Sequence, residues 1–297
     1  MMIRDDHERL MYEIMGSISA LNVPIVFKGA LVTKLVLAEN QFSDISRETG
    51  DIDANWIGTP PKSEYLVDVI SKALSNVSDS LHAKLTREYG DKKSAGIIVM
   101  DSTTNDPGIE MDISINKIQE SKTYTYGDLT ITGVLPTEIL ADKICVLSSR
   151  KIFRRAKDLV DIYALAHCVE VRTSEIYESH ERNGRILGSF TEFNTRKDDL
   201  NHAYQKLRGI ENKPQFEDVY QYVSKFVQPF GLDCMVDKVW NPQRSNWSDP
   251  PVSIDEQERP KKRTLSERLK RADEKVREYD EQNRNAKQHL RKNEPER

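Results

Sequence analysis

The chain has 297 residues, of which 37% are hydrophobic and 31% are charged, and its formal net charge is -4. This length allows two modest domains, each with a core of its own. The negative charge argues against a protein that coats nucleic acid indiscriminately, although a local basic patch remains compatible with it. The apolar runs fall short of the ~20 residues that span a bilayer, and residues 1–6 lack the apolar stretch of a secretory signal, so we expect no membrane insertion and a cytoplasmic location.

The first half of the chain alternates between helical and extended patterns. Residues 4–21 have helical spacing, 25–27 form a β-like run, and after Lys28-Gly29 a helical period continues to residue 39. A strand is expected at 51–57, a helix at 62–79, three strands at 83–89, 95–100 and 109–115, and a hairpin at 123–134. These elements predict an α+β fold with a small mixed sheet and flanking helices.

Helices dominate from Pro136 onward. We expect them at residues 136–149, 154–168, 198–209 and 215–228, followed by a proline- and serine-rich stretch and a densely charged tail. The expected division is therefore a catalytic domain at 1–135, a helical domain at 136–240 that completes the active-site cleft, and a linker with a charged helical tail at 241–297. Cys145, Cys168 and Cys234 have no paired spacing, so neither a disulfide framework nor a zinc site is indicated.

Three aspartates are the candidate metal ligands. Asp51 and Asp53 lie two residues apart on one predicted strand, so both side chains point to the same face. Asp112 interrupts an apolar alternation on another predicted strand, where an aspartate is disfavoured without a task. Such carboxylates repel one another unless a cation lies between them, so the trio predicts one or two Mg²⁺ ions. An Asp-x-Asp pair alone could equally mark a turn or an exposed strand end.

The turn before the second predicted helix favours the catalytic interpretation. Lys28-Gly29 follows a strand and opens a helix, which presents backbone N–H groups to a phosphate. This order of elements resembles the nucleotidyltransferase core of the DNA polymerase beta superfamily. The segments Phe27–Leu31 and Arg47–Asp53 resemble the first motifs of the AbiEii/AbiGii toxin family, and residues 135–143 and 154–163 resemble its second pair. The resemblance covers residues 20–235.

The resemblance implies a role for several further residues. Lys28, Gly29, Ala30, Thr33 and Arg47 would bind the phosphates of a nucleoside triphosphate (NTP). Ala30 stands where many superfamily members carry Ser or Gly, so backbone N–H groups, Lys28 or Thr33 would replace the missing hydroxyl.

The second pair of motifs implies two further catalytic residues. Lys143 would contact the triphosphate, and Asp158 would orient Lys143 or the acceptor hydroxyl, which completes the catalytic set with Asp51, Asp53 and Asp112. Lys143 could instead be a snorkelling side chain, and Asp158 a surface partner of Arg154 or Arg155.

Basic residues supply candidate RNA contacts. Arg154, Arg155 and Lys157 form a cluster beside Asp158 that suits an RNA backbone, although a solvated helix face explains it equally well. Arg87 and Arg47 are also candidates for phosphate or RNA contacts, with solvated loop residues as the alternative.

The family resemblance implies a Mg²⁺-dependent nucleotidyltransferase that acts as the toxin of a bacterial toxin–antitoxin or phage-abortive pair. A tRNA 3′ end is a candidate acceptor, and a cognate antitoxin or regulator is a candidate partner. Two alternatives stay open: modification of a protein or a small molecule, and a catalytically inactive nucleotide-binding module.

The tail carries a weak a/d seam, in which residues follow alternating steps of four and three. This seam predicts either a solvated helix or a helix for oligomerisation or antitoxin docking, at Leu265, Leu269, Ala272, Val276, Tyr279, Asn283, Ala286 and Leu290.

Overall fold

A computed structural model describes residues 2–89, 94–104, 106–115, 117–231 and 236–251. The chain divides into two compact units, Met1–Pro250 and Pro251–Arg297, and the first contains all the helices and strands named here. The seam predicted in the tail lies outside the described residues.

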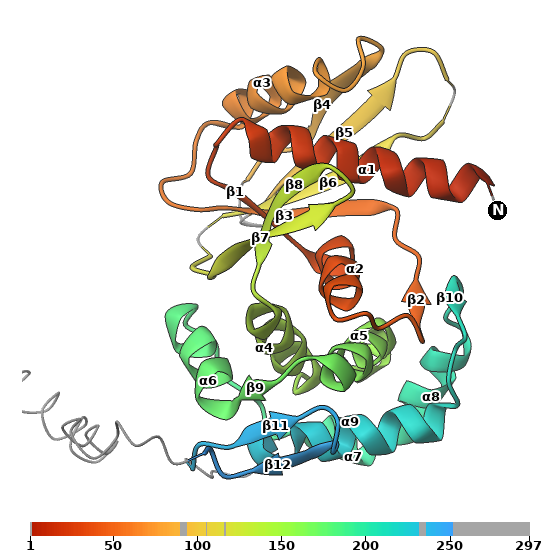
Figure 1. The fold of residues 1–297 in the computed structure, drawn as a ribbon, viewed down its shortest axis with the longest axis vertical. Coiled ribbons are helices and arrows are strands. Elements are labelled where there is room, and N and C mark those ends of the chain that lie inside the picture. Colours follow the sequence, from red (N-terminus) through yellow and green to blue (C-terminus); the bar gives the residue numbers. More distant parts are fainter. Residues whose placement is uncertain (1, 90–93, 105, 116, 232–235, 252–297) are drawn as a thin grey trace, which may run out of the picture. The chain divides into compact units, whose positions relative to one another are not determined.

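A mixed sheet of seven strands forms the centre of this unit, in the order β4-β5-β6-β3-β1-β8-β7 (Figure 1). Its strands are β1 (Ile25–Lys28), β3 (Asp51–Trp56), β4 (Leu81–Arg87), β5 (Ser94–Asp101), β6 (Ile109–Ser114), β7 (Ser121–Tyr126) and β8 (Leu129–Val134). The pairs β3–β6 and β1–β8 are parallel, and the other neighbours are antiparallel. Burial alternates along β6, whereas the last three residues of β3 are all buried, as expected for a central strand that is covered on both faces.

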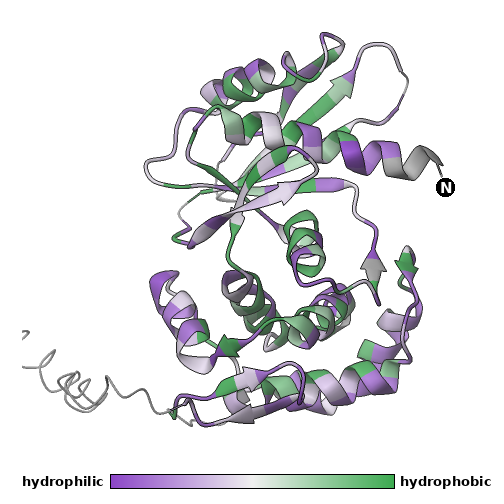
Figure 2. Cartoon of the chain, in the orientation of Figure 1, coloured by the Kyte–Doolittle hydropathy of each residue, from purple (hydrophilic) through white to green (hydrophobic). Residues whose placement is uncertain are grey.

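Helices cover the sheet on both sides. Helices α1 (Met2–Ala20) and α3 (Ser63–Leu74) pack on one side, whereas α2 (Gly29–Glu39) leaves the end of β1 and lies on the other (Figure 1). Helices α4 (Pro136–Leu147) and α5 (Ala156–Cys168) pack against α2 and against each other. Hydrophobic residues concentrate on the central strands and on α2, which is enclosed between the sheet and these helices (Figure 2). The sheet and the helical half are therefore joined through α2.

The remaining elements pack against α4 and α5 or against one another. They are the 3₁₀ helix Ile152–Arg154, β9 (Val171–Arg172), α6 (Thr173–Arg182), α7 (Thr191–Thr195), α8 (Lys197–Gln205), α9 (Phe216–Gly231), β11 (Val239–Asn241) and β12 (Asn246–Ser248). Strands β12, β11 and β9 form one small sheet, and β10 (Ile210–Glu211) pairs with β2 (Ser46–Arg47) in another. The indole of Trp240 is buried and donates to the carbonyl of Ala166 at 2.6 Å.

The expected fold class is confirmed: a mixed sheet with flanking helices is followed by a mainly helical half. The structure extends the folded part past the point where the sequence suggested a linker. Strand β12 belongs to the fold because Trp247 stacks on Phe226 and donates to its carbonyl oxygen at 3.0 Å. The proposed boundary between a catalytic and a helical domain stays a prediction. Within the described ranges, none of the helices combines the length and apolarity needed to cross a bilayer.

Candidate active site

Two of the three predicted metal ligands lie side by side in the sheet. Asp53 of β3 and Asp112 of β6 are register partners in a parallel pair, so their side chains share one face. Asp51 lies two residues before Asp53 on that face, at the exposed end of β3, and accepts a hydrogen bond from the hydroxyl of Thr49 at 2.6 Å. The structure therefore brings the three aspartates to one region of the sheet.

The turn from β1 into α2 closes against Asp53. Lys28 is the register partner of Asp53, and Gly29 follows it with a φ of 74°. A Cβ at Gly29 would lie 2.9 Å from the Cβ of Asp53, so no other residue fits this approach without displacement. Among the residues that the structure describes, no side chain caps the start of α2, which leaves its first N–H groups to other acceptors. An anion placed there would sit beside the aspartates.

Charges within this region are strongly affected by burial. Burial is the main cause that raises the pKa of Asp53; Lys28 opposes it, and the neighbouring Asp51 and Asp112 add to it. Burial also lowers the pKa of the Lys28 ammonium, although Asp53 and Asp112 offset part of this effect. Lys28 donates to the hydroxyl of Ser114 at 2.9 Å. A bound cation would offset both the burial cost of Asp53 and its repulsion by the other carboxylates.

A second charged cluster is buried between α2, α4 and α5. Lys143 lies 2.6 Å from a carboxylate oxygen of Asp161 and 3.4 Å from one of Asp158. Arg47 donates to both oxygens of Asp161, at 3.0 Å each. Asp161 is 4% exposed, and Lys143 9%, so this cluster is shielded from water.

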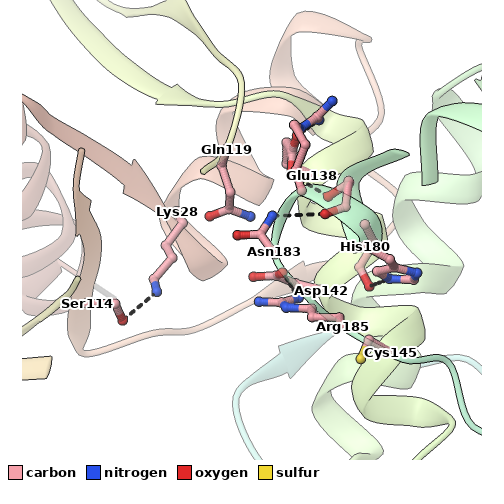
Figure 3. Close-up of polar contacts among 12 residues, drawn as sticks. Lys28, Ser114, Gln119, Glu138, Asp142, Cys145, His180, Asn183 and Arg185 are labelled. Carbon is pink, nitrogen blue, oxygen red and sulfur yellow. Dashed lines mark hydrogen bonds and ion pairs between the residues drawn. The ribbon is translucent and has the colours of Figure 1, made fainter. Parts of the chain in front are cut away.

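A third set of charges faces Lys28 from the helical half. Figure 3 shows Lys28 and Ser114 on one side, with Asp142 and Arg185 on the other. Arg185 forms an ion pair with Asp142, and its positive charge contributes to the lowered pKa of Lys28. Arg185 was not predicted, because it lies in a loop after the turn residues Asn183-Gly184 and belongs to no periodic pattern.

The family model described as "Nucleotidyl transferase AbiEii toxin, Type IV TA system" matches residues 9–222. The chain belongs to this family. It is accordingly a nucleotidyltransferase of the AbiEii toxins, as the motifs indicated. Membership implies an NTP as the donor substrate and an antitoxin as a partner.

Two solved structures are similar to this AbiEii chain. One is the nucleotidyltransferase toxin MenT4 from Mycobacterium tuberculosis H37Rv, with 13% identity, a TM-score of 0.39, and coverage of 62% of this chain and 68% of that one. The other is an antigenic nucleotidyltransferase-like protein from Paracoccidioides brasiliensis, with 14% identity, a TM-score of 0.39, and coverage of 67% and 93%. No curated protein matches the chain.

The donor chemistry of this AbiEii site fits a magnesium ion. Carboxylate oxygens are the ligands that Mg²⁺ prefers, and it commonly takes one or two of them together with substrate phosphates and water. In the part of the chain that is described, no three Asp, Glu, His or Cys side chains already surround one cation position. One reason is visible: Asp112 is engaged by an ion pair with Arg87. Cation binding by the three aspartates stays a prediction, which would require substrate phosphates or water to complete the ligand set.

Some predicted phosphate contacts have other partners in the structure. The Thr33 hydroxyl is buried and donates to the carbonyl of Gly29 at 2.9 Å, so it supports the turn from within α2. The guanidinium of Arg47 is held by Asp161. Ala30 lies in the first turn of α2 and offers only its backbone. The roles of these residues in phosphate binding stay predictions.

The predicted pair of Lys143 and Asp158 is in contact, but Asp161 is the nearer carboxylate. Sequence reasoning missed Asp161, although its position three residues after Asp158 places both on one side of α5 and could have indicated it. Asp158 also lies 3.6 Å from Arg155, which is the surface pairing considered as the alternative. Arg154 and Lys157 are exposed near the start of α5.

Proposed function

We propose that the chain transfers a nucleotidyl group from an NTP to a hydroxyl of RNA, with the 3′ end of tRNA as the acceptor, in a Mg²⁺-dependent reaction. The observation that carries this proposal is the approach of Gly29 to Asp53. It puts the uncapped start of α2, which attracts phosphate, beside the carboxylates that can hold a cation. The phosphate-binding start of α2 and the cation-binding carboxylates of the proposed triphosphate site are thus adjacent.

Each group then has a defined task. The α2 N–H groups and Lys28 bind the donor phosphates, and Asp51, Asp53 and Asp112 hold Mg²⁺. When bound, the cation neutralises charge that develops on the phosphates and favours ionisation of the acceptor hydroxyl. The acceptor hydroxyl loses its proton to solvent as its oxygen bonds to the α-phosphorus, and the bond from the α-phosphorus to the oxygen bridging to the β-phosphate breaks. Pyrophosphate leaves past Lys28 and Arg185, whose positive charges stabilise it.

Asp161 completes the proposed arrangement through its contact with Lys143. It keeps the buried Lys143 charged and oriented, because their charged groups are 2.6 Å apart. Asp158 is then positioned by Lys143 toward the acceptor side, next to the basic cluster at the start of α5.

We assign binding of the acceptor RNA to that basic cluster. Arg154, Arg155 and Lys157 can contact backbone phosphates, which provide affinity without sequence information. As a toxin of a type IV system, the protein would act on cytoplasmic RNA until its antitoxin intervenes, and arrest of an infected cell would serve phage defence.

The proposal is tested with each of the four labelled NTPs, Mg²⁺ and total RNA. We expect label on tRNA, loss of label when periodate has destroyed the tRNA 3′ diol, and a decrease of at least ~10²-fold in Asp51→Asn and Asp53→Asn. Asp68→Asn, which changes an exposed aspartate of α3, is the matched control. Full labelling by Asp53→Asn would refute the assigned site, and labelling of oxidised tRNA would refute the 3′ end as the acceptor.

A further inference from the structure

Arg87 reaches the candidate site from two strands away, and a β-bulge directs it there. Leu85 of β4 pairs with Ile97 of β5, but the next pair is Arg87 with Gly96, so β4 advances two residues while β5 advances one. In an unbroken ladder Arg87 would share the buried face of Leu85. The extra residue turns its side chain to the opposite face, which carries Asp112, as bulges beside active sites commonly do.

Gly96 opens the path between Arg87 and Asp112. It is the register partner of both residues, so it lies directly between them on β5. A Cβ at this position would lie 3.3 Å from the Cβ of Arg87 and 3.5 Å from its guanidinium carbon. It would also lie 2.8 Å from the hydroxyl of Thr86. A side chain at position 96 would therefore push the guanidinium away from Asp112.

The guanidinium is held at the end of this path. Arg87 forms an ion pair with Asp112 and donates to the Ser94 hydroxyl at 3.0 Å and to the Ser94 carbonyl at 3.4 Å. The Ser94 hydroxyl is itself 3.5 Å from the same oxygen of Asp112. The bulge, the glycine and the serine together give Arg87 one defined position.

Four charges then follow one another across the sheet: Arg87, Asp112, Asp53 and Lys28. The two carboxylates lie between two cations, which stabilise their negative charges without a metal. A guanidinium binds a carboxylate through its oxygens, which are the same atoms that a metal cation needs. The guanidinium and a cation at the same oxygen of Asp112 would repel each other, so the ion pair with Arg87 opposes cation binding there.

We infer that Arg87 is a positioning residue that competes with the divalent cation for Asp112. This inference rests on the proposed function, in which the three aspartates hold the cation. Without substrate, the ion pair with Arg87 leaves the cation only partial use of Asp112. Donor phosphates add oxygen ligands for the cation and an alternative partner for the guanidinium. They therefore favour the site in which all three aspartates hold the cation.

Binding of Mn²⁺ to the full chain without nucleotide tests this inference, with calorimetry and electron paramagnetic resonance as readouts. Arg87→Met should bind Mn²⁺ about three- to tenfold more tightly, because it removes a half-exposed competing ion pair. Gly96→Ala should shift the affinity in the same direction, although it keeps the arginine. Lys84→Met, which removes an exposed cation on the same strand, should leave the affinity unchanged.

Two further variants make the result specific. Arg87→Lys keeps the charge without the planar fork, so its affinity should lie between those of the native chain and Arg87→Met. Asp112→Asn added to Arg87→Met should abolish the gain. Unchanged or weaker Mn²⁺ binding by Arg87→Met would overturn the inference while leaving the cation site intact. Loss of the native Mn²⁺ binding is expected only from Asp51→Asn or Asp53→Asn, and retention there would refute the proposed cation site itself.

Discussion

Two features restrict the residue at position 29: its backbone φ is positive, and a Cβ there would overlap Asp53. A comparison with Gly58 separates the effects of the two features. Gly58 also has a positive φ, of 91°, but a Cβ there would meet nothing within 4 Å. Ala at Gly58 should cost about 1 kcal/mol of folding free energy, and Ala at Gly29 should cost more because its Cβ also overlaps Asp53. Only Gly29→Ala should also lower nucleotidyl transfer, by more than about tenfold, because its methyl group displaces Asp53. Thermal melts and the labelling assay check this, and equal activity of the two variants would argue against the role of this approach.

Asp161 is the carboxylate on which two buried cations depend. Asp161→Asn should destabilise the fold by about 3–5 kcal/mol, because Arg47 and Lys143 lose their counter-charge in a buried site. Asp198→Asn, an exposed change on α8, is the control. Denaturant unfolding at neutral pH measures the difference, and a loss below about 1 kcal/mol would show that the cluster is solvated.

The same residue gives the fold a defined acid sensitivity. Burial raises the pKa of Asp161, but Lys143 and Arg47 together outweigh it, so the net shift is downward. The unfolded chain therefore takes up this proton first as the pH falls below about 4, and stability decreases from there through the folded pKa. In Asp161→Asn this part of the pH dependence should be absent.

The candidate site could be predicted from sequence only where the reasons are local. Period two places Asp51 and Asp53 on one face of a strand, and the glycine turn marks the start of a helix. The partnership of Asp53 with Asp112 depends on strand register between segments more than 50 residues apart, which no local pattern encodes. Arg87 depends on a bulge and Arg185 on tertiary contacts, so their positions became visible only in the fold. The spacing of Asp161 from Asp158 was visible in the sequence, but its pairing with Arg47 was not.

At the scale of elements, a reciprocal amide contact joins α6 to the linker between β6 and β7. Asn183 accepts from the N–H of Ile118 and donates to its carbonyl, at 3.0 Å each. Asn183→Ala should cost about 1–2 kcal/mol and increase hydrogen exchange in residues 117–120, because both hydrogen bonds are lost. Asn194→Ala, at an exposed position of α7, should leave that exchange unchanged. Unaltered exchange in Asn183→Ala would show that other contacts hold the linker.

Helices and strands were predicted where their own sequences carry a clear pattern, and they were missed where they depend on distant partners. Strands such as 51–56 carry their own alternation and closing turns, and the first helix was placed within two residues of its bounds. Strands β9, β11 and β12 have two or three residues each and exist because of distant partners, as when Val171 pairs with Trp240. Helix α6 was missed because its sequence is mostly polar and its buried side is narrow.

The whole chain should tolerate removal of its last segment. Residues 1–250 form one compact unit, so a chain ending at Pro250 should melt within a few degrees of the full chain. A chain ending at Lys238 should be far less stable, because it lacks the buried Trp240 and its hydrogen bond to Ala166. Calorimetric melts of the three chains test this. Similar melting of the two truncated chains would contradict it.

The uncapped start of α2 has a consequence for the protein inside a cell. A helix whose first N–H groups are completed by a donor phosphate is more stable with its substrate than without it. At a concentration one hundred times the dissociation constant, such a ligand adds about 2.7 kcal/mol to the free energy of unfolding. Under the proposed function, the chain should therefore resist proteolysis better with NTP bound than without it.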